Sequence, residues 1–284
     1  MDYNFAKDLQ AIRSVLDISQ NELAKHLGVE QVTLSRSEQE QTRPSEELLM
    51  KVYTFAFDKN IIINHLKEML WTEEMEASHR LLFHGAKGEI KGKPDIQKSR
   101  LNNDFGQGFY TGENYEQAVS FVAGFEKSSV YFMDFNPEGL DCKKYKVDRD
   151  WMMTIAYYRG RLQEYSDHPV IKALLDDSRA CDYIVAPIAD NRMFQIINSF
   201  IEGELTDEQC KHCLAATNLG MQYVFISDRA MRQVALLERC YLAGNERKHY
   251  MSIRSAEAKD GRDKVKLAKV KYRGKGRYID EILG

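Results

Sequence analysis

The chain has 284 residues, of which 43% are hydrophobic and 29% are charged, as in an ordinary globular protein. Its formal net charge of −3 excludes an overall electrostatic attraction to nucleic acid or to an anionic membrane. No apolar run approaches the roughly 20 residues that cross a bilayer, and the amino terminus lacks the basic-then-apolar pattern of a signal peptide. We therefore expect a cytoplasmic protein with no membrane partner.

Five cysteines are scattered along the chain, an odd number that suits reduced thiols in the cytosol. The stretch Cys210-Lys-His212-Cys213 has the spacing of half a zinc site, but no second pair accompanies it. Zinc sites usually draw on two such pairs. We expect no metal, and we expect these two thiols to pack on a helix.

The pattern of capping and apolar residues in 1–60 predicts a run of short helices. Ser19 and Glu22 have the spacing of a capping box at the start of the second helix. Gly28 supplies the turn that ends this helix, and a third short helix follows directly. Ser45 comes after a proline, and it begins a fourth helix that carries several apolar residues.

The words Ser-Gln-Asn-Glu-Leu-Ala-Lys-His-Leu-Gly-Val (19–29) and Arg-Pro-Ser (43–45) closely resemble the repressor-type, Xre or Cro-like, helix-turn-helix family. In that family the second helix of the motif enters the major groove of DNA, usually as part of a dimer. The resemblance implies the following DNA-binding residues: Gln31, Thr33 and Arg36 at base edges, and Gln20 near a phosphate. The resemblance also implies a homodimer.

A second interpretation of this region stays open. Glu30, Glu38 and Glu40 make its surface less basic than that of many DNA readers. A helical interaction module that does not bind DNA would have the same pattern of caps and apolar positions.

We predict a helical linker over residues 61–79 and a domain that mixes strands and helices over residues 80–245. The expected strands are 81–85, 130–134, 182–188 and 222–227, and the expected helices are 151–158, 192–201 and 230–241. Short segments of both kinds indicate an α+β fold. Neither a GxGxxG fingerprint nor a Walker loop is present, which argues against a Rossmann or P-loop site.

The most informative segment is 104–122. Gly106 and Gly108 allow the backbone to approach a ligand closely or to take a positive φ. Phe109 and Tyr110 begin a short strand, so one ring should enter the core and the other should face a surface. An amphipathic helix follows the strand. The segment therefore predicts a ligand-stacking turn ahead of a helix.

Three words together resemble the His-Tyr-Glu class of ADP-ribosyltransferases: Leu82-Phe83-His84-Gly85, Asp104-Phe-Gly-Gln-Gly-Phe-Tyr110 and Met221-Gln222-Tyr-Val-Phe-Ile226. The third word departs from that class, because Gln222 stands where many members have glutamate. The span from Leu81 to Leu237 also resembles a bacterial family of unknown function, the DUF3990-type domain, which is assigned to the same fold. The resemblance implies a small helix-turn-helix domain followed by a split-sheet domain.

The resemblance also implies roles in binding NAD as a substrate. His84 would hydrogen-bond the adenosine-side ribose, the Gly85 backbone would hold the nicotinamide carboxamide, and Tyr110 would stack on the nicotinamide ring. Gln222 would meet a ribose hydroxyl without bringing a negative charge. The remaining cofactor-binding candidates are Arg100, Asp104, Phe105, Gly106 and Gly108, with Lys98 and Arg100 as candidates for neutralising the pyrophosphate.

Cleavage of the nicotinamide–ribose bond develops positive charge on the sugar, so preorganised electrostatics dominates such a site. A neighbouring carboxylate could supply the charge that Gln222 lacks or act as a general base, and the candidates are Asp104, Asp182, Asp190 and Glu113.

The expected function is an ADP-ribosyltransferase of a bacterial or phage toxin or defence type, whose helix-turn-helix binds DNA or represses its own operon, with an antitoxin as a further partner. The alternatives are a regulator that senses NAD or ADP-ribose without cleavage, and an NAD glycohydrolase. The acceptor of ADP-ribose is left open.

The carboxyl-terminal segment, residues 246–284, is basic. Nine basic residues and two acidic ones lie between Lys259 and Arg277. Lysines partly alternate with apolar residues from Lys264 to Lys271, which predicts an exposed edge strand. The alternative is a strip that binds phosphate groups.

Overall fold

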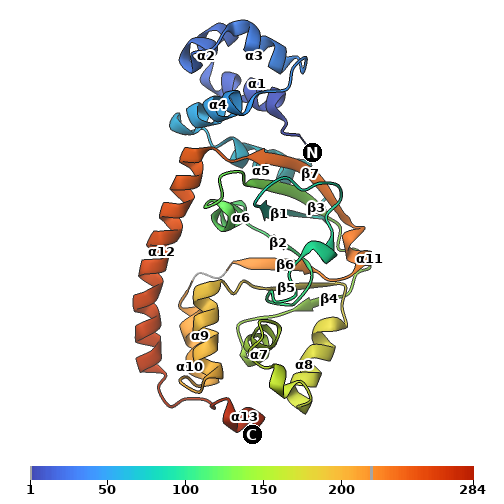
Figure 1. Cartoon of the computed structure of the whole chain (residues 1–284), viewed down its shortest axis with the longest axis vertical. Helices are drawn as coiled ribbons and strands as arrows, with labels where there is room; N and C mark the ends of the chain where they lie inside the picture. The colour runs from blue at the N-terminus through green and yellow to red at the C-terminus, as the bar shows by residue number, and fades with distance from the viewer. Residues whose placement is uncertain (1, 218–219) are drawn as a thin grey trace. The chain divides into compact units, whose positions relative to one another are not determined.

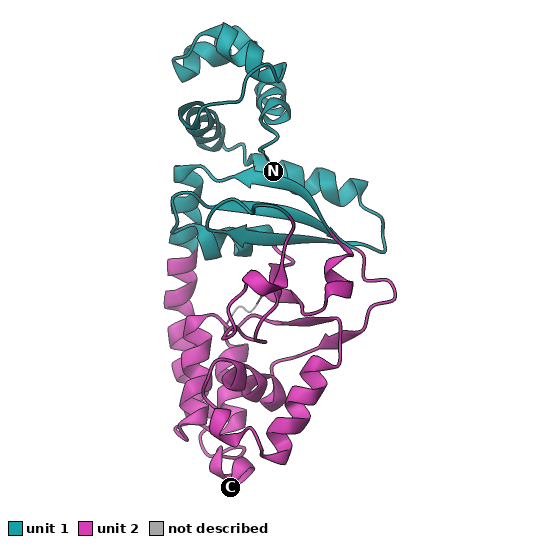
Figure 2. Cartoon of the chain, turned by 45° about the vertical axis from the view of Figure 1, so that its right-hand side comes forward, with its two compact units in different colours: residues 1–92, 115–135, 235–253 teal, residues 93–114, 136–234, 254–284 magenta. Residues whose placement is uncertain are grey.

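Five helices come first, and strands and helices follow them in mixed order (Figure 1). The computed structural model describes residues 2–217 and 220–284 and divides into two units (Figure 2). The first unit comprises Met1–Gly92, Tyr115–Phe135 and Ala235–Ile253. The second comprises Lys93–Asn114, Asn136–Val234 and Arg254–Gly284. The units are therefore interleaved along the chain.

The helical region of the first unit consists of α1 (Phe5–Leu16), α2 (Gln20–Leu27), α3 (Gln31–Glu38), α4 (Glu46–Asp58) and α5 (Ile63–Glu74). The predicted capping box is confirmed, because Ser19 Oγ accepts from the Glu22 N–H at 3.2 Å and Glu22 accepts from the Ser19 N–H at 2.8 Å. Gly28 ends α2 with φ +62°, as predicted. Ser45 caps α4. Apolar residues of α1 to α4 form one buried cluster.

Strands of the first unit lie in the order β1 (Arg80–Ala86), β3 (Ser129–Phe135) and β7 (Val234–Tyr241), with β1 antiparallel to β3. Helix α6 (Tyr115–Val122) packs against β1 at Gly85, where an added Cβ would lie 2.5 Å from a backbone oxygen of α6. The prediction of a helix over 230–241 was wrong. Only a short helix, α11 (Asp228–Met231), precedes the strand.

A buried ionic network joins the helical region to β7. Lys67 of α5 lies 2.7 Å from a carboxylate oxygen of Asp8 and 2.8 Å from one of Glu238. Tyr53 donates a hydrogen bond to Asp8, and Trp71 donates one to Glu238 at 3.1 Å. Buried charges persist only when they are paired. The network therefore makes the helical region and β7 depend on each other.

Strands of the second unit lie in the order β4 (Cys142–Lys144), β5 (Tyr183–Pro187), β6 (Met221–Phe225) and β2 (Phe109–Gly112). The pair β4–β5 is parallel, and β5–β6 and β6–β2 are antiparallel. The predicted strands at 81–85, 130–134, 182–188 and 222–227 are confirmed as β1, β3, β5 and β6, with shifts of one or two residues at the ends. The α+β class is confirmed.

Helices of the second unit are α7 (Arg149–Tyr158), α8 (Pro169–Arg179), α9 (Asn191–Ile201) and α10 (Asp207–Ala215), with short 3₁₀ turns at Ile96–Lys98 and Gln163–Tyr165. Helices α7 and α9 share one buried cluster with β5 and β6, and Trp151 is a fully buried member of it. The sequence prediction missed β4 and α8, and it placed a helix around Cys210 and Cys213 without giving its bounds. Cys210 and Cys213 are buried on α10, as two packed thiols were predicted to be.

The basic segment is a helix and not an edge strand. Helix α12 runs from Gly244 to Lys271, and a short α13 (Asp280–Leu283) ends the chain. Ala268 is buried, and an ion pair of 2.6 Å joins Lys264 to Asp260 one turn earlier. Such i,i+4 pairs support a helix and have no counterpart in a strand. Within the described residues, no helix is both long enough and apolar enough to cross a membrane.

Candidate functional sites

A cluster of buried polar groups gathers around Asp104 in the second unit; we call it the Asp104 cluster and define it by Asp104, Arg159, Gln222 and the backbone of 187–189. The Asp104 carboxylate accepts from Arg159 Nε at 2.8 Å and Nη2 at 2.5 Å. It also accepts from the Ala189 N–H at 3.1 Å and from Gln222 Nε2 at 2.9 Å. Asp104 and Gln222 are each only 5% exposed. The guanidinium therefore neutralises the carboxylate inside the protein.

Gln222 is fixed by two acceptors. Its Nε2 donates to Asp104 and also to the carbonyl oxygen of Pro187, at 3.1 Å. A side-chain amide has two N–H donors, so both are used inside the protein. Gln222 can offer a ligand only its carbonyl oxygen, which is an acceptor. Donation of an amide N–H to a carboxylate also polarises the amide and strengthens that oxygen as an acceptor.

Tyr110 closes the glycine turn that precedes it. Its hydroxyl donates to the carbonyl oxygen of Gly106 at 2.8 Å and accepts from the Phe105 N–H at 3.1 Å. Gly106 has φ +74°, and a Cβ there would lie 2.9 Å from the ring of Tyr158. Burial raises the pKa of Tyr110, so its hydroxyl stays protonated and keeps both bonds.

Tyr110 and Gln222 share one face of the β2–β6 pair. Tyr110 pairs with Val224 and Gly112 pairs with Gln222, which makes Tyr110 and Gln222 diagonal neighbours. Diagonal neighbours of an antiparallel pair lie about 7–8 Å apart. Phe109 faces the opposite side and is buried, so the two rings lie on different faces as predicted. Tyr110, however, packs partly buried against the core cluster of the second unit and is not the surface-facing ring that the sequence predicted.

The other predicted binding residues are distributed between the units. Phe105 is buried, with its ring 5.1 Å from that of Tyr145, and an added Cβ at Gly108 would meet Val224 at 2.8 Å. Arg100 and Lys98 are exposed. His84 and Gly85 lie on β1, in the first unit. In the second unit the structure thus brings Asp104, Phe105, Gly106, Gly108, Tyr110 and Gln222 together.

The four carboxylates proposed from the sequence have different environments. Asp104 is neutralised by Arg159. Asp182 precedes β5, whereas Gln222 faces Ala186, four residues further along, which corresponds to about 13 Å. Asp190 caps α9 by accepting from two backbone N–H groups. Glu113 is exposed and follows Gly112, the residue that pairs with Gln222.

Sequence reasoning missed Arg159, although this residue organises the cluster. Its guanidinium also donates to the Ala189 carbonyl oxygen and lies 4.6 Å from the centre of the Phe194 ring. Arg159 is the C-cap that follows α7, a common place for a basic residue. Nothing local distinguishes it, because its partner Asp104 lies 55 residues away.

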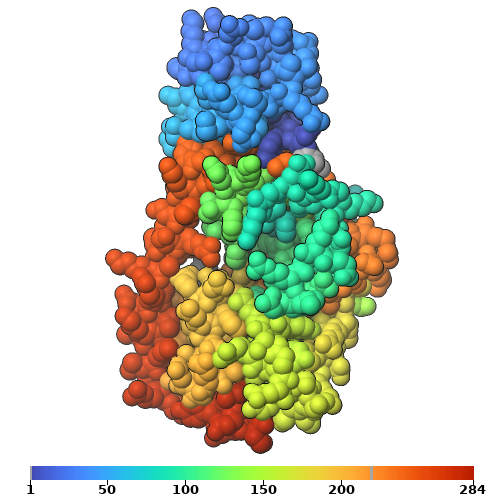
Figure 3. Space-filling view, viewed as in Figure 1, coloured from blue at the N-terminus to red at the C-terminus, as the bar shows by residue number. Residues whose placement is uncertain are grey.

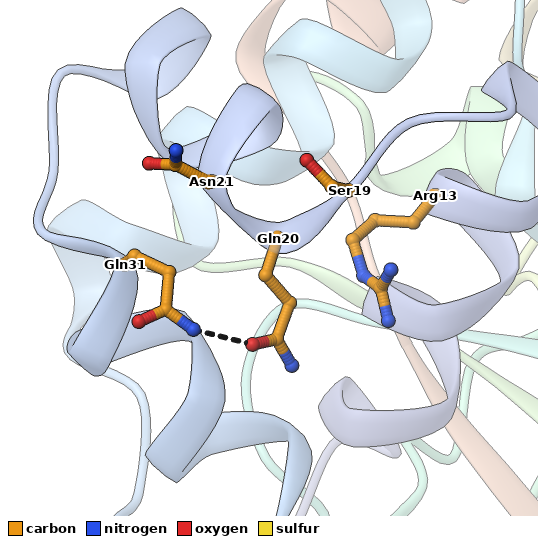
Figure 4. Close-up of a pocket in the computed structure, with 5 residues that line it drawn as sticks. All are labelled: Arg13, Ser19, Gln20, Asn21 and Gln31. Atoms are coloured by element: carbon orange, nitrogen blue, oxygen red, sulfur yellow. Dashed lines mark hydrogen bonds between the residues drawn. The ribbon is translucent and has the colours of Figure 1, made fainter.

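A second candidate site lies in the helical region, where an open depression of about 550 Å³ is lined by Arg13, Ser19, Gln20, Asn21 and Gln31 (Figure 4). Gln31 Nε2 donates to Gln20 Oε1 at 2.7 Å, the contact marked in Figure 4. Polar side chains that can both donate and accept hydrogen bonds therefore line the depression. Three of them, Gln20, Asn21 and Gln31, are uncharged.

The Gln20–Gln31 pair is held in place by Glu38. Gln20 Nε2 donates to Glu38 at 2.7 Å, and Arg13 donates twice to the same carboxylate, at 2.6 and 2.9 Å. The chain of bonds fixes the orientation of Gln31, which itself is exposed at the first turn of α3. Thr33 and Arg36, predicted with Gln31 as one surface, are also exposed on α3.

Among the described residues, no group of three or more histidine, cysteine, aspartate or glutamate side chains is arranged to hold a metal ion. The family model whose description is "Protein of unknown function (DUF3990)" matches residues 81–236. No curated protein and no solved structure matches the chain.

Proposed function

The chain belongs to the DUF3990 family, and from that premise we propose that it is an NAD-dependent ADP-ribosyltransferase with a DNA-binding helix-turn-helix. The proposal rests on the three sequence motifs that contain His84, Tyr110 and Gln222. Each of these three residues lies on a strand. NAD would be the substrate, and nicotinamide would be the leaving group. A toxin-like or defence-like role, with an antitoxin as partner, would suit an enzyme joined to a repressor-type module.

The observation that carries the proposal is the fixed amide of Gln222 beside Tyr110. Tyr110, which is partly buried, would supply an aromatic face that attracts a flat cationic ring such as nicotinamidium. The Gln222 carbonyl oxygen would accept from a ribose hydroxyl and face the sugar as positive charge develops there. Because the hydrogen bond to Asp104 already fixes the amide, the Gln222 side chain loses little conformational entropy when a ligand binds.

One observation favours a second function, a regulator that senses NAD or ADP-ribose without cleaving it. The carboxylate nearest to Gln222 is paired with Arg159, so the cluster brings no net negative charge to a cationic sugar. A neutral site binds such a ligand but stabilises the transition state less than a carboxylate does. Glu113 is the exposed carboxylate that would supply this charge if the enzyme proposal holds.

The proposal for DNA binding is supported by the Gln20–Gln31 pair. Gln31 keeps one N–H donor and its carbonyl oxygen for a ligand, and a bidentate glutamine contact of this kind reads adenine in the major groove. Gln20 precedes this contact at the amino terminus of α2, where backbone N–H groups favour a phosphate. Thr33 and Arg36 would contact neighbouring bases from the same helix.

Catalysis is tested by incubating the full chain with NAD and separating nicotinamide, ADP-ribose and labelled protein, DNA or RNA by mass. The enzyme proposal predicts nicotinamide release that Tyr110→Ala and Gln222→Ala each reduce at least tenfold. Tyr223→Ala is the matched control, because Tyr223 lies on the opposite face of β6. Binding of NAD without release of nicotinamide would favour the sensor. Activity lost in Tyr223→Ala but kept in Tyr110→Ala would refute the site.

DNA binding is tested by selecting duplexes from a random pool with the full chain and then measuring the affinity of variants for the selected sequence. Gln31→Ala should weaken binding by about 1–3 kcal/mol. The control is Gln39→Ala, since Gln39 and Gln41 form another exposed glutamine pair, at 2.8 Å. No enriched sequence, or equal losses in both variants, would favour an interaction module that does not bind DNA.

A further inference from the structure

The carboxyl-terminal part of the second unit carries a concentration of positive charge that neither candidate site uses. We call it the basic strip and define it by nine residues, Lys259, Arg262, Lys264, Lys266, Lys269, Lys271, Arg273, Lys275 and Arg277. All of them are exposed except Lys269, which is half-buried. Figure 3 shows this segment in orange-red and red as a continuous surface beside the yellow atoms of α9 and α10.

Little of this charge is compensated. Lys264 pairs with Asp260 at 2.6 Å and Lys266 pairs with Asp263 at 3.5 Å, and all four side chains are more than half exposed. In the part of the chain that the structure describes, the other seven residues of the strip make no ion pair. The whole chain has a net charge of −3, so the strip is a local feature. Uncompensated charge at this density attracts a polyanion.

The backbone that carries the strip is anchored to α10. Ala268 is buried, the Lys269 carbonyl oxygen accepts from Gln209 at 2.9 Å, and the Tyr272 ring stacks on His212 with their centres 3.5 Å apart. These contacts turn one side of the helix toward α10. The charged side chains therefore occupy the remaining, outward side.

The turn after α12, Arg273-Gly-Lys-Gly-Arg277, is also ordered by backbone contacts. The Arg277 N–H donates to Asp207 at 2.8 Å and its carbonyl oxygen accepts from the Asp207 N–H at 2.9 Å. Thr206 donates to the Lys275 carbonyl oxygen. Gly276 has φ +87° and leaves no room for a Cβ beside Asp207. The turn thus presents three cationic side chains from a backbone whose own bonds do not involve them.

We propose that the basic strip binds the phosphodiester backbone of a nucleic acid, as a site distinct from α3. Arginine and lysine on an ordered frame contact phosphates without reading sequence. Base stacking is not part of this site, because Tyr272 is already stacked on His212. Insertion into a membrane is also disfavoured, because the large exposed apolar side chains that lie between the residues of the strip, Leu267 and Val270, are too few for an apolar face.

The test measures binding of the full chain to short duplex DNA, duplex RNA and single-stranded RNA of scrambled sequence, by fluorescence anisotropy between about 50 and 200 mM salt. All proteins carry Gln31→Ala and Arg36→Ala, so that α3 contributes little. For duplex DNA, the triple variant Arg273→Gln, Lys275→Gln, Arg277→Gln should make the negative slope of log affinity against log salt concentration shallower by about 2–3. The three arms identify which nucleic acid the strip prefers.

The matched control removes three exposed cations from elsewhere in the second unit, as Lys144→Gln, Lys146→Gln, Arg179→Gln. It has the same net charge as the test variant and should leave the slope unchanged. Equal losses in the two triple variants would overturn the proposal, because they would indicate a general effect of net charge. Binding to anionic phosphatidylserine vesicles with no binding to any nucleic acid would overturn it as well.

Discussion

Replacing Gln222 by glutamate would introduce the residue that many ADP-ribosyltransferases have in the motif that this segment resembles, yet we expect the change to destabilise the second unit. Glutamate cannot donate to Asp104 or to the Pro187 carbonyl oxygen, which Gln222 reaches at 2.9 and 3.1 Å. A hydrogen bond to a charged group contributes about 1.5–3 kcal/mol and one to a neutral group about 0.5–1.5 kcal/mol. The expected loss at neutral pH is therefore about 2–4.5 kcal/mol, before any repulsion between the two carboxylates.

The loss should depend on pH. Burial and the neighbouring Asp104 both raise the pKa of a glutamate at position 222 above that in the unfolded chain. The folded variant then binds an extra proton, so its stability relative to the unvaried protein rises as the pH falls. A protonated carboxyl can donate once to Asp104, which would recover part of the deficit near pH 5.

Urea unfolding at pH 8 and pH 5 measures this effect, with tryptophan fluorescence as the probe. The chain has two tryptophans, and Trp151 is fully buried in the core of the second unit. A Trp71→Phe background would therefore make the signal specific for that unit. Gln222→Met, which removes both donors without adding a charge, is the control and should show a deficit that does not change with pH. A glutamate variant as stable as its background at pH 8 would refute the reasoning.

Three further perturbations test the first unit by thermal and urea unfolding. Lys67→Met should cost about 3–5 kcal/mol by leaving Asp8 and Glu238 buried and unpaired, and a loss below 1 kcal/mol would contradict a buried pairing. Burial raises the pKa of Glu246 from the ordinary 4.5 to about 7, so stability should fall by about 3 kcal/mol as the pH rises across that interval. Glu246→Gln should remove this dependence, and an unchanged pH profile would argue against it. Gly85→Ala should lower the free energy of unfolding by about 1–3 kcal/mol, because its Cβ would lie 2.5 Å from a backbone oxygen of α6. A variant as stable as the wild type would contradict this, because it would mean that α6 shifts away at no cost.

Local signals in the sequence predicted local structure well. Ser19, Glu22 and Gly28 lie within ten residues of one another, and each acts on backbone groups of its own helix. The alternation of Phe109 and Tyr110 likewise follows from strand geometry alone. These elements could be predicted because the physics that sets them is confined to a few neighbouring residues.

Elements set by distant partners could not be predicted in this way. The stretch that forms β7 is rich in alanine, leucine, glutamate and arginine, which favour a helix. It forms a strand with Glu238 buried, because Lys67 pairs with that carboxylate and Trp71 donates a hydrogen bond to it. Trp71 and Glu238 are 167 residues apart in the chain. Arg159 was missed for the same reason. At Lys264 the alternation with apolar residues predicted a strand, but Asp260 one turn earlier and the packing of Ala268 favour a helix.

The interleaving of the two units sets an order of events during synthesis. Helices α1 to α5 leave the ribosome before β7, and Glu238 follows Trp71 by 167 residues, which at about 5–20 residues per second takes roughly 10–30 s. During that interval Lys67 has Asp8 as its only carboxylate in the network. A chain that terminates before β7 would therefore carry a weakened helical region, and we expect cellular proteases to remove such fragments before they compete with the complete protein.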